Sequence, residues 1–200
     1  SDWFDGHAMM MRVVETERTQ PQDVPESNTQ QSEHPPPSPR QPVMEVVRIS
    51  LSNNHLVGTI PEEIQYLSQL VSLDLSYNDL TGTLPQDNPL AGKEDNNAVS
   101  TLGHYLRLTN LQLQHNRLSG SIPKSLGYNL ITHQLILDHN QFSGSIPSTL
   151  GNLINLRLLS LHSNRLTGSI PNNLGFLKRL EQLELQHNQL KGSIPFELCF

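Results

Sequence analysis

Residues Leu156 to Gly175 read L-R-L-L-S-L-H-S-N-R-L-T-G-S-I-P-N-N-L-G. Reduced to its recurring positions, this stretch is L-x-x-L-x-L-x-x-N-x-L-x-G-x-I-P-x-x-L-G, and it recurs at steps of 24 residues with one step of 38. The Asn of the pattern falls at Asn54, Asn78, Asn116, Asn140, Asn164 and Asn188. A fixed period of about 20 to 50 residues is the signature of a solenoid built from stacked units.

The L-x-L part of each unit alternates apolar and polar residues, which predicts a strand with one buried face. The paired apolar positions are Ile49/Leu51, Leu73/Leu75, Leu111/Leu113, Leu135/Leu137, Leu159/Leu161 and Leu183/Leu185. One unit cannot bury this face alone, so neighbouring units must stack into a parallel sheet with a continuous core.

The other repeated positions predict how the chain turns after each strand. The amide of Asn can donate to and accept from backbone groups that no strand partner serves, so stacked units are expected to form a structural Asn ladder. The Gly that follows, as at Gly168, is expected where a bend or a positive φ is needed. The Pro, as at Pro171, suits an irregular return path because it fixes φ and lacks a donor.

The motif L-x-G-x-I-P-x-x-L-G resembles the plant-type leucine-rich repeat found in receptor-kinase ectodomains and polygalacturonase-inhibiting proteins, and it covers residues 46–200. The resemblance implies an α/β solenoid: a curved right-handed array of six 24-residue units with a concave parallel β-sheet and an irregular convex side. It also implies a second short strand around L-x-G-x-I-P in each unit.

Composition shifts along the chain predict its organisation. Residues 1–42 are expected to be disordered or weakly ordered and to include a Pro-rich linker, and residues 43–200 are expected to form the repeat domain. The first fifteen residues allow a divergent cap over the first unit or a frayed terminus, and we favour the second. Residues 86–101 replace the two residues found elsewhere between Pro and Leu, which predicts an insertion loop on the convex or lateral side.

One unit departs from the pattern just after Gly127. Asn129 and Thr132 stand where the next unit has Leu153 and Leu156, while Leu130 and Ile131 lie one step off. We therefore expect a local slip or kink on the convex side that places Leu130 and Ile131 in the core.

Several functional classes find no support in the sequence. The net charge of −6 gives no basic surface for binding nucleic acid. The sequence contains no run of 18 apolar residues, so it predicts no membrane insertion in the region shown. Phosphate-binding, nucleophile-elbow and zinc-protease motifs do not occur, so the chain is predicted to be non-enzymatic and to need no cofactor. The single cysteine, Cys199, allows no internal disulfide, and the sequence has no Asn-x-Ser/Thr sequon. The resemblance nevertheless implies a protein at the cell surface or attached to a membrane.

The predicted binding face is the concave sheet, because residues between the buried leucines form columns across neighbouring strands. A protein or peptide partner is expected to dock on units three to five, where two apolar side chains interrupt the polar columns beside several histidines. The candidate residues are Gln112, Gln114, His115, Ile136, Asp138, His139, Leu158 and His162.

Histidine is unusually frequent, with nine residues in the chain. Neighbouring imidazoles could bind a transition metal, sense pH near their ordinary pKa or simply be surface residues, and we favour the last interpretation. We predict a non-enzymatic recognition module for a protein or peptide, belonging to a cell-surface receptor. The alternatives are an inhibitor of secreted glycan-degrading enzymes and an ectodomain fragment of a receptor kinase.

Overall fold

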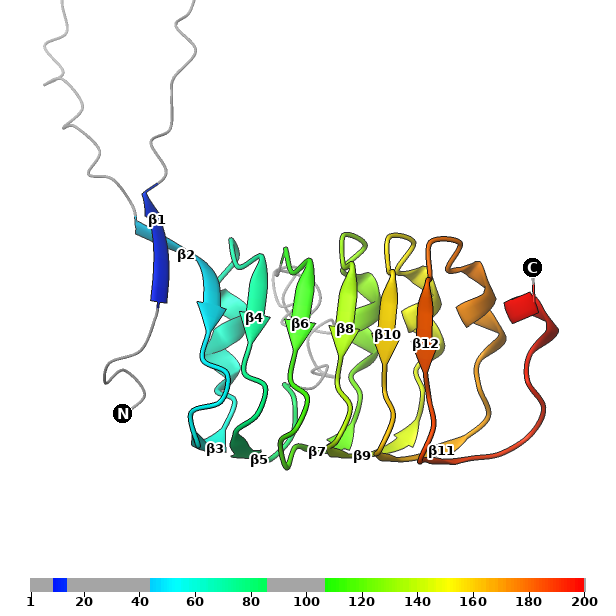
Figure 1. The fold of residues 1–200 in the computed structure, drawn as a ribbon. Helices are drawn as coiled ribbons and strands as arrows, with labels where there is room; N and C mark the ends of the chain where they lie inside the picture. Colours follow the sequence, from blue (N-terminus) through cyan, green and yellow to red (C-terminus); the bar gives the residue numbers. More distant parts are fainter. Residues whose placement is uncertain (1–8, 14–43, 86–106, 200) are drawn as a thin grey trace, which may run out of the picture.

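The structure is a computed structural model, and it describes residues 9–13, 44–85 and 107–199. Its main layer is a sheet of seven strands in the order β1-β2-β4-β6-β8-β10-β12 (Figure 1). The strands are β1 (Met9–Val13), β2 (Met44–Ser50), β4 (Ser72–Asp74), β6 (Asn110–Gln112), β8 (Gln134–Ile136), β10 (Leu158–Ser160) and β12 (Gln182–Glu184). From β2 onward all neighbours are parallel and equivalent residues of successive units face one another, as Leu159 faces Leu135 and Leu183. This register confirms the predicted stacking of units in a solenoid.

A second row of short strands follows the turn after each main strand, at the lower edge of the molecule in Figure 1. It comprises β3 (Val57–Thr59), β5 (Asp79–Thr81), β7 (Ser119–Ser121), β9 (Gln141–Ser145), β11 (Arg165–Gly168) and β13 (Gln189–Leu190). These strands also pair in parallel and form two small sheets. One consists of β3 and β5, and the other has the order β7-β9-β11-β13. The expected second strand around L-x-G-x-I-P is therefore present.

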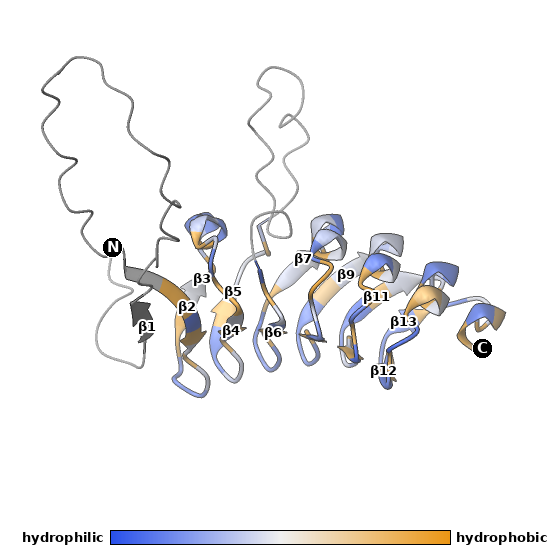
Figure 2. Cartoon of the chain, turned by 90° about the horizontal axis from the view of Figure 1, so that it is seen from above, coloured by the Kyte–Doolittle hydropathy of each residue, from blue (hydrophilic) through white to orange (hydrophobic). Residues whose placement is uncertain are grey.

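In the five units whose return path the structure describes, that path includes a short 3-10 helix on the side opposite the main sheet (Figure 2). The helices are η1 (Glu62–Tyr66), η2 (Lys124–Tyr128), η3 (Ser148–Asn152), η4 (Asn172–Phe176) and η5 (Phe196–Cys199). The repeated Pro supplies the extended residue before the turn, as Pro147 does with φ −64° and ψ 128°. Within the described residues no helix is long and apolar enough to cross a membrane.

A glycine inside each of η2, η3 and η4 sets how closely these helices approach the next one. A Cβ added to Gly151 would collide with the carbonyl group of Asn173 in the next helix. Only the missing side chain lets the two helices approach this closely, because interiors pack to nearly crystalline density.

The core is the space between the main sheet and the 3-10 helices. Leu137, Leu159 and Leu161 from the strands, Phe142 behind them and Leu150 from η3 are all inaccessible to solvent. Each such side chain stabilises the fold by about 1.5–3 kcal/mol relative to leaving it in water. The paired leucines of the four middle units are therefore buried as the alternation predicted, whereas Ile49, Leu51, Leu183 and Leu185 in the first and last units are half-buried.

The predicted slip after Gly127 is wrong. Helix η2 has the same length as η3, and Asn129 and Thr132 occupy buried positions while Leu130 and Ile131 are 49% and 41% exposed. The carbonyl oxygen of Leu108 accepts from both Asn129 Nδ2 at 2.8 Å and Thr132 Oγ1 at 3.1 Å. Because these bonds satisfy the two polar side chains, the unit keeps its register and needs no rearrangement of the backbone.

The frayed terminus that we expected for the first fifteen residues is also wrong for Met9–Val13. Strand β1 pairs antiparallel with β2, from Met9 opposite Ile49 to Val13 opposite Met44. This pairing covers an edge that would otherwise present unpaired backbone groups, which fits the cap interpretation. The Pro-rich linker and the insertion at residues 86–101 lie outside the described residues.

Candidate functional site

The outer face of the seven-stranded sheet, which we call the sheet face, is the concave face of the sequence analysis. Two adjacent columns of residues run along it at the ends of the main strands. The ladder column consists of Asn54, Asn78, Asn116, Asn140, Asn164 and Asn188. The turn column consists of the residue before each of these, Asn53, Tyr77, His115, His139, Ser163 and His187.

Each asparagine of the ladder column from Asn78 onward bonds its own unit to the preceding one. The Nδ2 group of Asn140 donates to the carbonyl oxygens of Leu113 at 2.9 Å, Leu137 at 3.3 Å and Asp138 at 3.1 Å. Its Oδ1 accepts from the backbone N–H of Leu118 at 2.9 Å. The same arrangement repeats at Asn164. Four backbone groups at the strand ends thus find partners in one buried amide.

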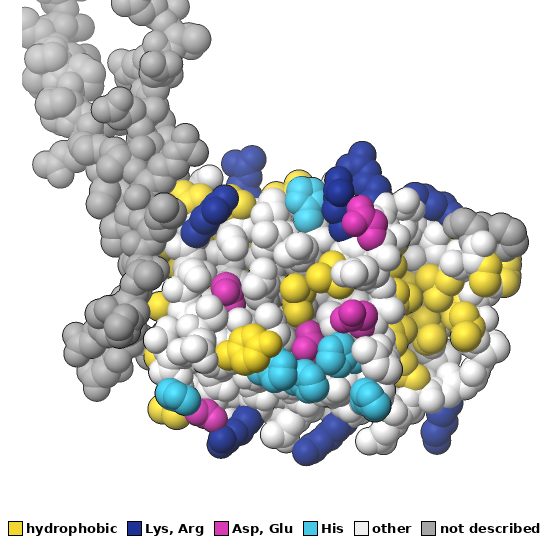
Figure 3. All heavy atoms as spheres, viewed as in Figure 1, with side chains coloured by type: hydrophobic (Ala, Val, Ile, Leu, Met, Phe, Trp, Pro, Cys, Tyr) yellow, Lys and Arg dark blue, Asp and Glu magenta, His cyan; other side chains and the backbone are white. Residues whose placement is uncertain are grey.

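The turn column has a different backbone conformation and a different environment. Its six residues have φ between 50° and 59°, in the left-handed region, where Asn and His are found more often than most residues. The conformation turns the chain and sends these side chains to the lower rim of the sheet face, where Figure 3 shows histidines gathered side by side. The column can hold different residue types because its side chains stand outside the core.

Four aromatic rings meet on this rim. Tyr77 stacks on His115 with ring centroids 4.3 Å apart, and His115 stacks on His139 at 4.1 Å. His162, one residue earlier in its unit, meets His139 edge-on at 4.8 Å. We call these four residues, together with Asp138, the histidine row. The residues of the histidine row follow strands β4, β6, β8 and β10, so the row spans the middle of the sheet.

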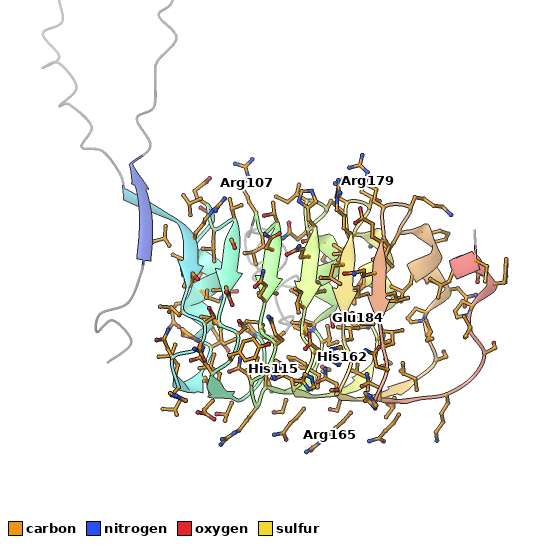
Figure 4. All side chains as sticks on the ribbon, in the orientation of Figure 1. Arg107, His115, His162, Arg165, Arg179 and Glu184 are labelled. Atoms are coloured by element: carbon orange, nitrogen blue, oxygen red, sulfur yellow. The ribbon has the colours of Figure 1, made fainter. Side chains whose placement is uncertain are left out.

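Two carboxylates accompany the histidine row. Asp138 Oδ2 lies 3.5 Å from His162 Nε2, and Glu184 Oε2 lies 3.9 Å from the same nitrogen. Figure 4 labels His162 and Glu184 in neighbouring units. Asp138 is only 6% exposed although it lies on the sheet face, because the neighbouring side chains cover it. The other ring nitrogen of His162 is 3.1 Å from Ser163 Oγ, which helps to orient the ring.

The pKa of His139 is lowered from its ordinary value of 6.5. Burial is the largest cause, since it disfavours the charged form, and the neighbouring His115 adds to the effect. Asp138 opposes the shift by favouring a charged imidazole, but it does not reverse it. His139 therefore favours the neutral form, in which one ring nitrogen carries a lone pair.

The structure brings together four of the predicted site residues, His115, Asp138, His139 and His162. Gln112 is the last residue of β6, and Gln114 lies two residues beyond it. Both are half-buried, and Gln114 Oε1 is buried without a hydrogen-bond partner among the described residues. Ile136 and Leu158 are half-buried rather than exposed as expected. They lie on diagonal positions of neighbouring strands, because Ser160 faces Ile136 while Leu158 faces Gln134.

The predicted partner-binding set leaves out two members of this region, Tyr77 and Glu184, although the repeat places both on the sheet face. Tyr77 occupies the same column as His115, so its place in the row could have been found from the repeat alone. The proximity of Glu184 to His162 depends on side-chain rotamers, which no sequence column specifies.

Two family models match the chain, and both are described as leucine-rich repeat. One matches residues 132–190, and the other matches residues 45–67, 69–89 and 107–129. A comparison with curated proteins gave no match.

Several solved structures are similar to this chain over three-quarters of its length. The ectodomain of the plant membrane receptor kinase GASSHO1/SCHENGEN3 from Arabidopsis thaliana, in complex with CASPARIAN STRIP INTEGRITY FACTOR 2, is 39% identical with a TM-score of 0.69; the match covers 78% of this chain and 17% of that one. The Arabidopsis receptor kinase HAESA, in complex with the peptide hormone IDA and the co-receptor SERK1, is 38% identical with a TM-score of 0.64, covering 76% and 23%.

A shorter relative is matched over most of its own length as well. The BIR2 ectodomain from Arabidopsis thaliana is 31% identical with a TM-score of 0.61, and the match covers 74% of this chain and 70% of that one. The chain thus spans less than a quarter of the large receptor ectodomains but most of the BIR2 ectodomain.

Proposed function

The chain belongs to the leucine-rich repeat family, in its plant-type class, and from this premise we propose that it is a non-enzymatic recognition module whose sheet face binds a protein or a peptide. The partner docks across units three to five, on strands β6, β8 and β10. The contact is centred on Gln112, His115, Ile136, Asp138, His139, Leu158 and His162.

The observation that carries the proposal is the juxtaposition of apolar and aromatic groups on an otherwise polar face. Ile136 and Leu158 are half-buried on neighbouring strands, and the stacked rings of His115 and His139 lie below them. Apolar and aromatic groups surrounded by polar residues are what binding hot spots are made of. The rigid ladder beneath them holds these groups in place before the partner arrives, which reduces the entropy lost on binding.

The relatives support the same class of partner. The matched GASSHO1/SCHENGEN3 structure is a complex with CASPARIAN STRIP INTEGRITY FACTOR 2, and the HAESA structure is a complex with a peptide hormone and a co-receptor. An extended peptide suits a surface of parallel columns, since each column offers an equivalent contact every strand. By this likeness the module belongs to a signalling receptor at the cell surface.

The inhibitor alternative draws less support from the site. An inhibitor of this kind would present an acidic or aromatic patch to an enzyme cleft, and the candidates on the sheet face are Asp74, Tyr77 and Asp138. Asp74 Oδ1 accepts from Ser76 Oγ at 2.6 Å, and Asp138 lies 3.5 Å from a histidine nitrogen. Both carboxylates are thus engaged within the chain, which leaves less free acidic surface for an enzyme.

The test begins with selection of peptides from a random library on the whole immobilised chain, followed by affinity measurements with the selected peptide. The variant Ile136→Ser with Leu158→Ser is expected to weaken binding by more than about 10-fold, because it removes the apolar centre. The matched control is Ile154→Ser with Phe176→Ser, two apolar side chains that are 57% and 58% exposed on the return path. Equal losses from both pairs, or a loss from the control pair alone, would contradict docking on the sheet face.

A further inference from the structure

We propose that His115, Asp138 and His139, with His162 beside them, form a binding site for a divalent first-row transition metal ion of the Zn²⁺ class. The site shares these four residues with the proposed partner contact, but ion binding does not require the partner. It uses side chains from three neighbouring units, so the repeat itself assembles it.

The geometry brings enough ligand atoms together. One ring nitrogen each from His115 and His139 and one carboxylate oxygen from Asp138 all lie within 4.8 Å of one another. Ligands of a tetrahedral ion with bonds of about 2.0–2.2 Å stand roughly 3.3–3.5 Å apart. The three groups therefore need to close by little more than an ångström, which rotation of the two imidazoles about their side-chain torsions can supply.

His162 is a candidate for a fourth ligand and has a supporting contact of its own. Its Nε2 is 3.5 Å from Asp138 Oδ2, but it lies outside the three groups whose ligand atoms are all within 4.8 Å of one another, so its ring must also move toward the ion. Its Nδ1 is 3.1 Å from Ser163 Oγ, the kind of second contact that orients a ligating histidine in metal sites. The backbone also fixes the spacing of the units, since His115 N–H donates to the carbonyl oxygen of Asp138 at 3.1 Å.

The electrostatics of Asp138 give an independent reason for a cation here. The side chain of Asp138 is 8% exposed. Within the described residues its only partner at salt-bridge distance is His162, which is charged only when protonated. Burying a carboxylate without a permanently charged partner is costly. A divalent ion would supply that charge.

The ligand types select the class of ion. Imidazole nitrogens with one carboxylate suit Zn²⁺, Cu²⁺ and Ni²⁺, whereas Mg²⁺ and Ca²⁺ require six or more ligands that are nearly all oxygen. The site is therefore expected to discriminate against the hard cations.

The experiment is isothermal titration calorimetry of the whole chain with ZnCl₂ alone and, separately, with MgCl₂. We expect about one Zn²⁺ per chain and no heat of binding with Mg²⁺. The variant His115→Asn with His139→Asn is expected to bind at least about 100-fold more weakly, because it removes two ligands. Asn suits the left-handed backbone at both positions, since Asn53 already holds it in the same column.

The control variant His55→Asn with His133→Asn removes two exposed imidazoles outside the histidine row and is expected to bind Zn²⁺ as the wild type does. Asp138→Asn provides a second variant with nearly unchanged shape, in which binding is again lost. Absence of Zn²⁺ binding by the wild-type chain, unchanged affinity in both site variants, or an equal loss in the control would overturn the proposal. Peptide affinity measured in the presence of a chelator tests the proposed function separately, so the two can fail independently.

Discussion

The ladder column and the turn column are neighbours in the sequence, yet they do opposite work. The ladder column holds the same residue six times, and Asn78 to Asn164 are buried with their amides bonded to two units. The turn column holds Asn, Tyr, His and Ser at equivalent left-handed positions, and its rings stand at the surface. The difference teaches where a repeat protein can vary: the fold demands one residue type at the first column and only a tolerated backbone conformation at the second.

The largest expected loss of stability comes from a substitution in the core behind both columns. Leu137→Ala is expected to lower the free energy of unfolding by about 2–5 kcal/mol, because it leaves a cavity in a fully buried site. Leu130→Ala is the matched control, since its side chain is 49% exposed. Urea denaturation followed by circular dichroism measures both. A large loss of stability in Leu130→Ala would mean that Leu130 fills the core, as the predicted slip after Gly127 requires.

The next effect compares a buried member of the ladder column with its exposed first member. Asn164→Ala leaves the N–H of Phe142 and three carbonyl oxygens without their side-chain partner, so a loss of about 1–3 kcal/mol is expected. Asn54 lies in the first unit, is exposed and donates to Ser52 O, so Asn54→Ala is expected to cost only a few tenths of a kcal/mol. A urea midpoint unchanged by Asn164→Ala would show that the ladder does not stabilise the fold.

The sequence was sufficient wherever a position repeats. The period of Asn164 and Leu161 predicted parallel strands in register, and the position of Gly168 predicted the positive φ that the structure has there, 76°. These features follow from the backbone path, which every unit must share for the stack to close. Periodicity therefore carries the fold.

The sequence was insufficient wherever side chains choose among neighbours. Asn129 and Thr132 stay in the core because the carbonyl oxygen of Leu108 accepts from both, and no pattern of residues announces that bond. Likewise, the meeting of Tyr77, His115 and His139 in one stack depends on rotamers at left-handed positions. The columns showed which residues are adjacent, but the structure was needed to bring their rings and carboxylates together.

The smallest expected effect is a pH dependence that belongs to the turn column. The pKa of His139 is lowered in the folded chain from 6.5, so the unfolded chain binds more protons as the pH falls through this range. Stability from this group is therefore present above pH 6.5 and is lost as the pH falls through the lower, folded-state pKa. The ring is largely in contact with solvent, so the effect is small.

His139→Asn isolates this contribution, because Asn keeps the left-handed backbone and does not titrate. Thermal unfolding of the wild type and the variant at several pH values between about 5 and 8 gives the comparison. The wild type is expected to lose more stability than the variant toward acid. A parallel decline in the two proteins would mean that His139 is as readily protonated in the folded chain as in the unfolded one.

Adjacent residues of one turn stabilise the fold unequally, and urea titrations of two variants of the same unit measure the difference. Asn140→Ala and His139→Asn change neighbouring positions of the same turn in the same unit. Asn140→Ala leaves four backbone groups without their side-chain partner, so we expect it to lower the free energy of unfolding by about 1–3 kcal/mol. For His139→Asn we expect a change within about 0.5 kcal/mol. Equal midpoints for the two variants, or a larger loss for His139→Asn, would contradict this difference.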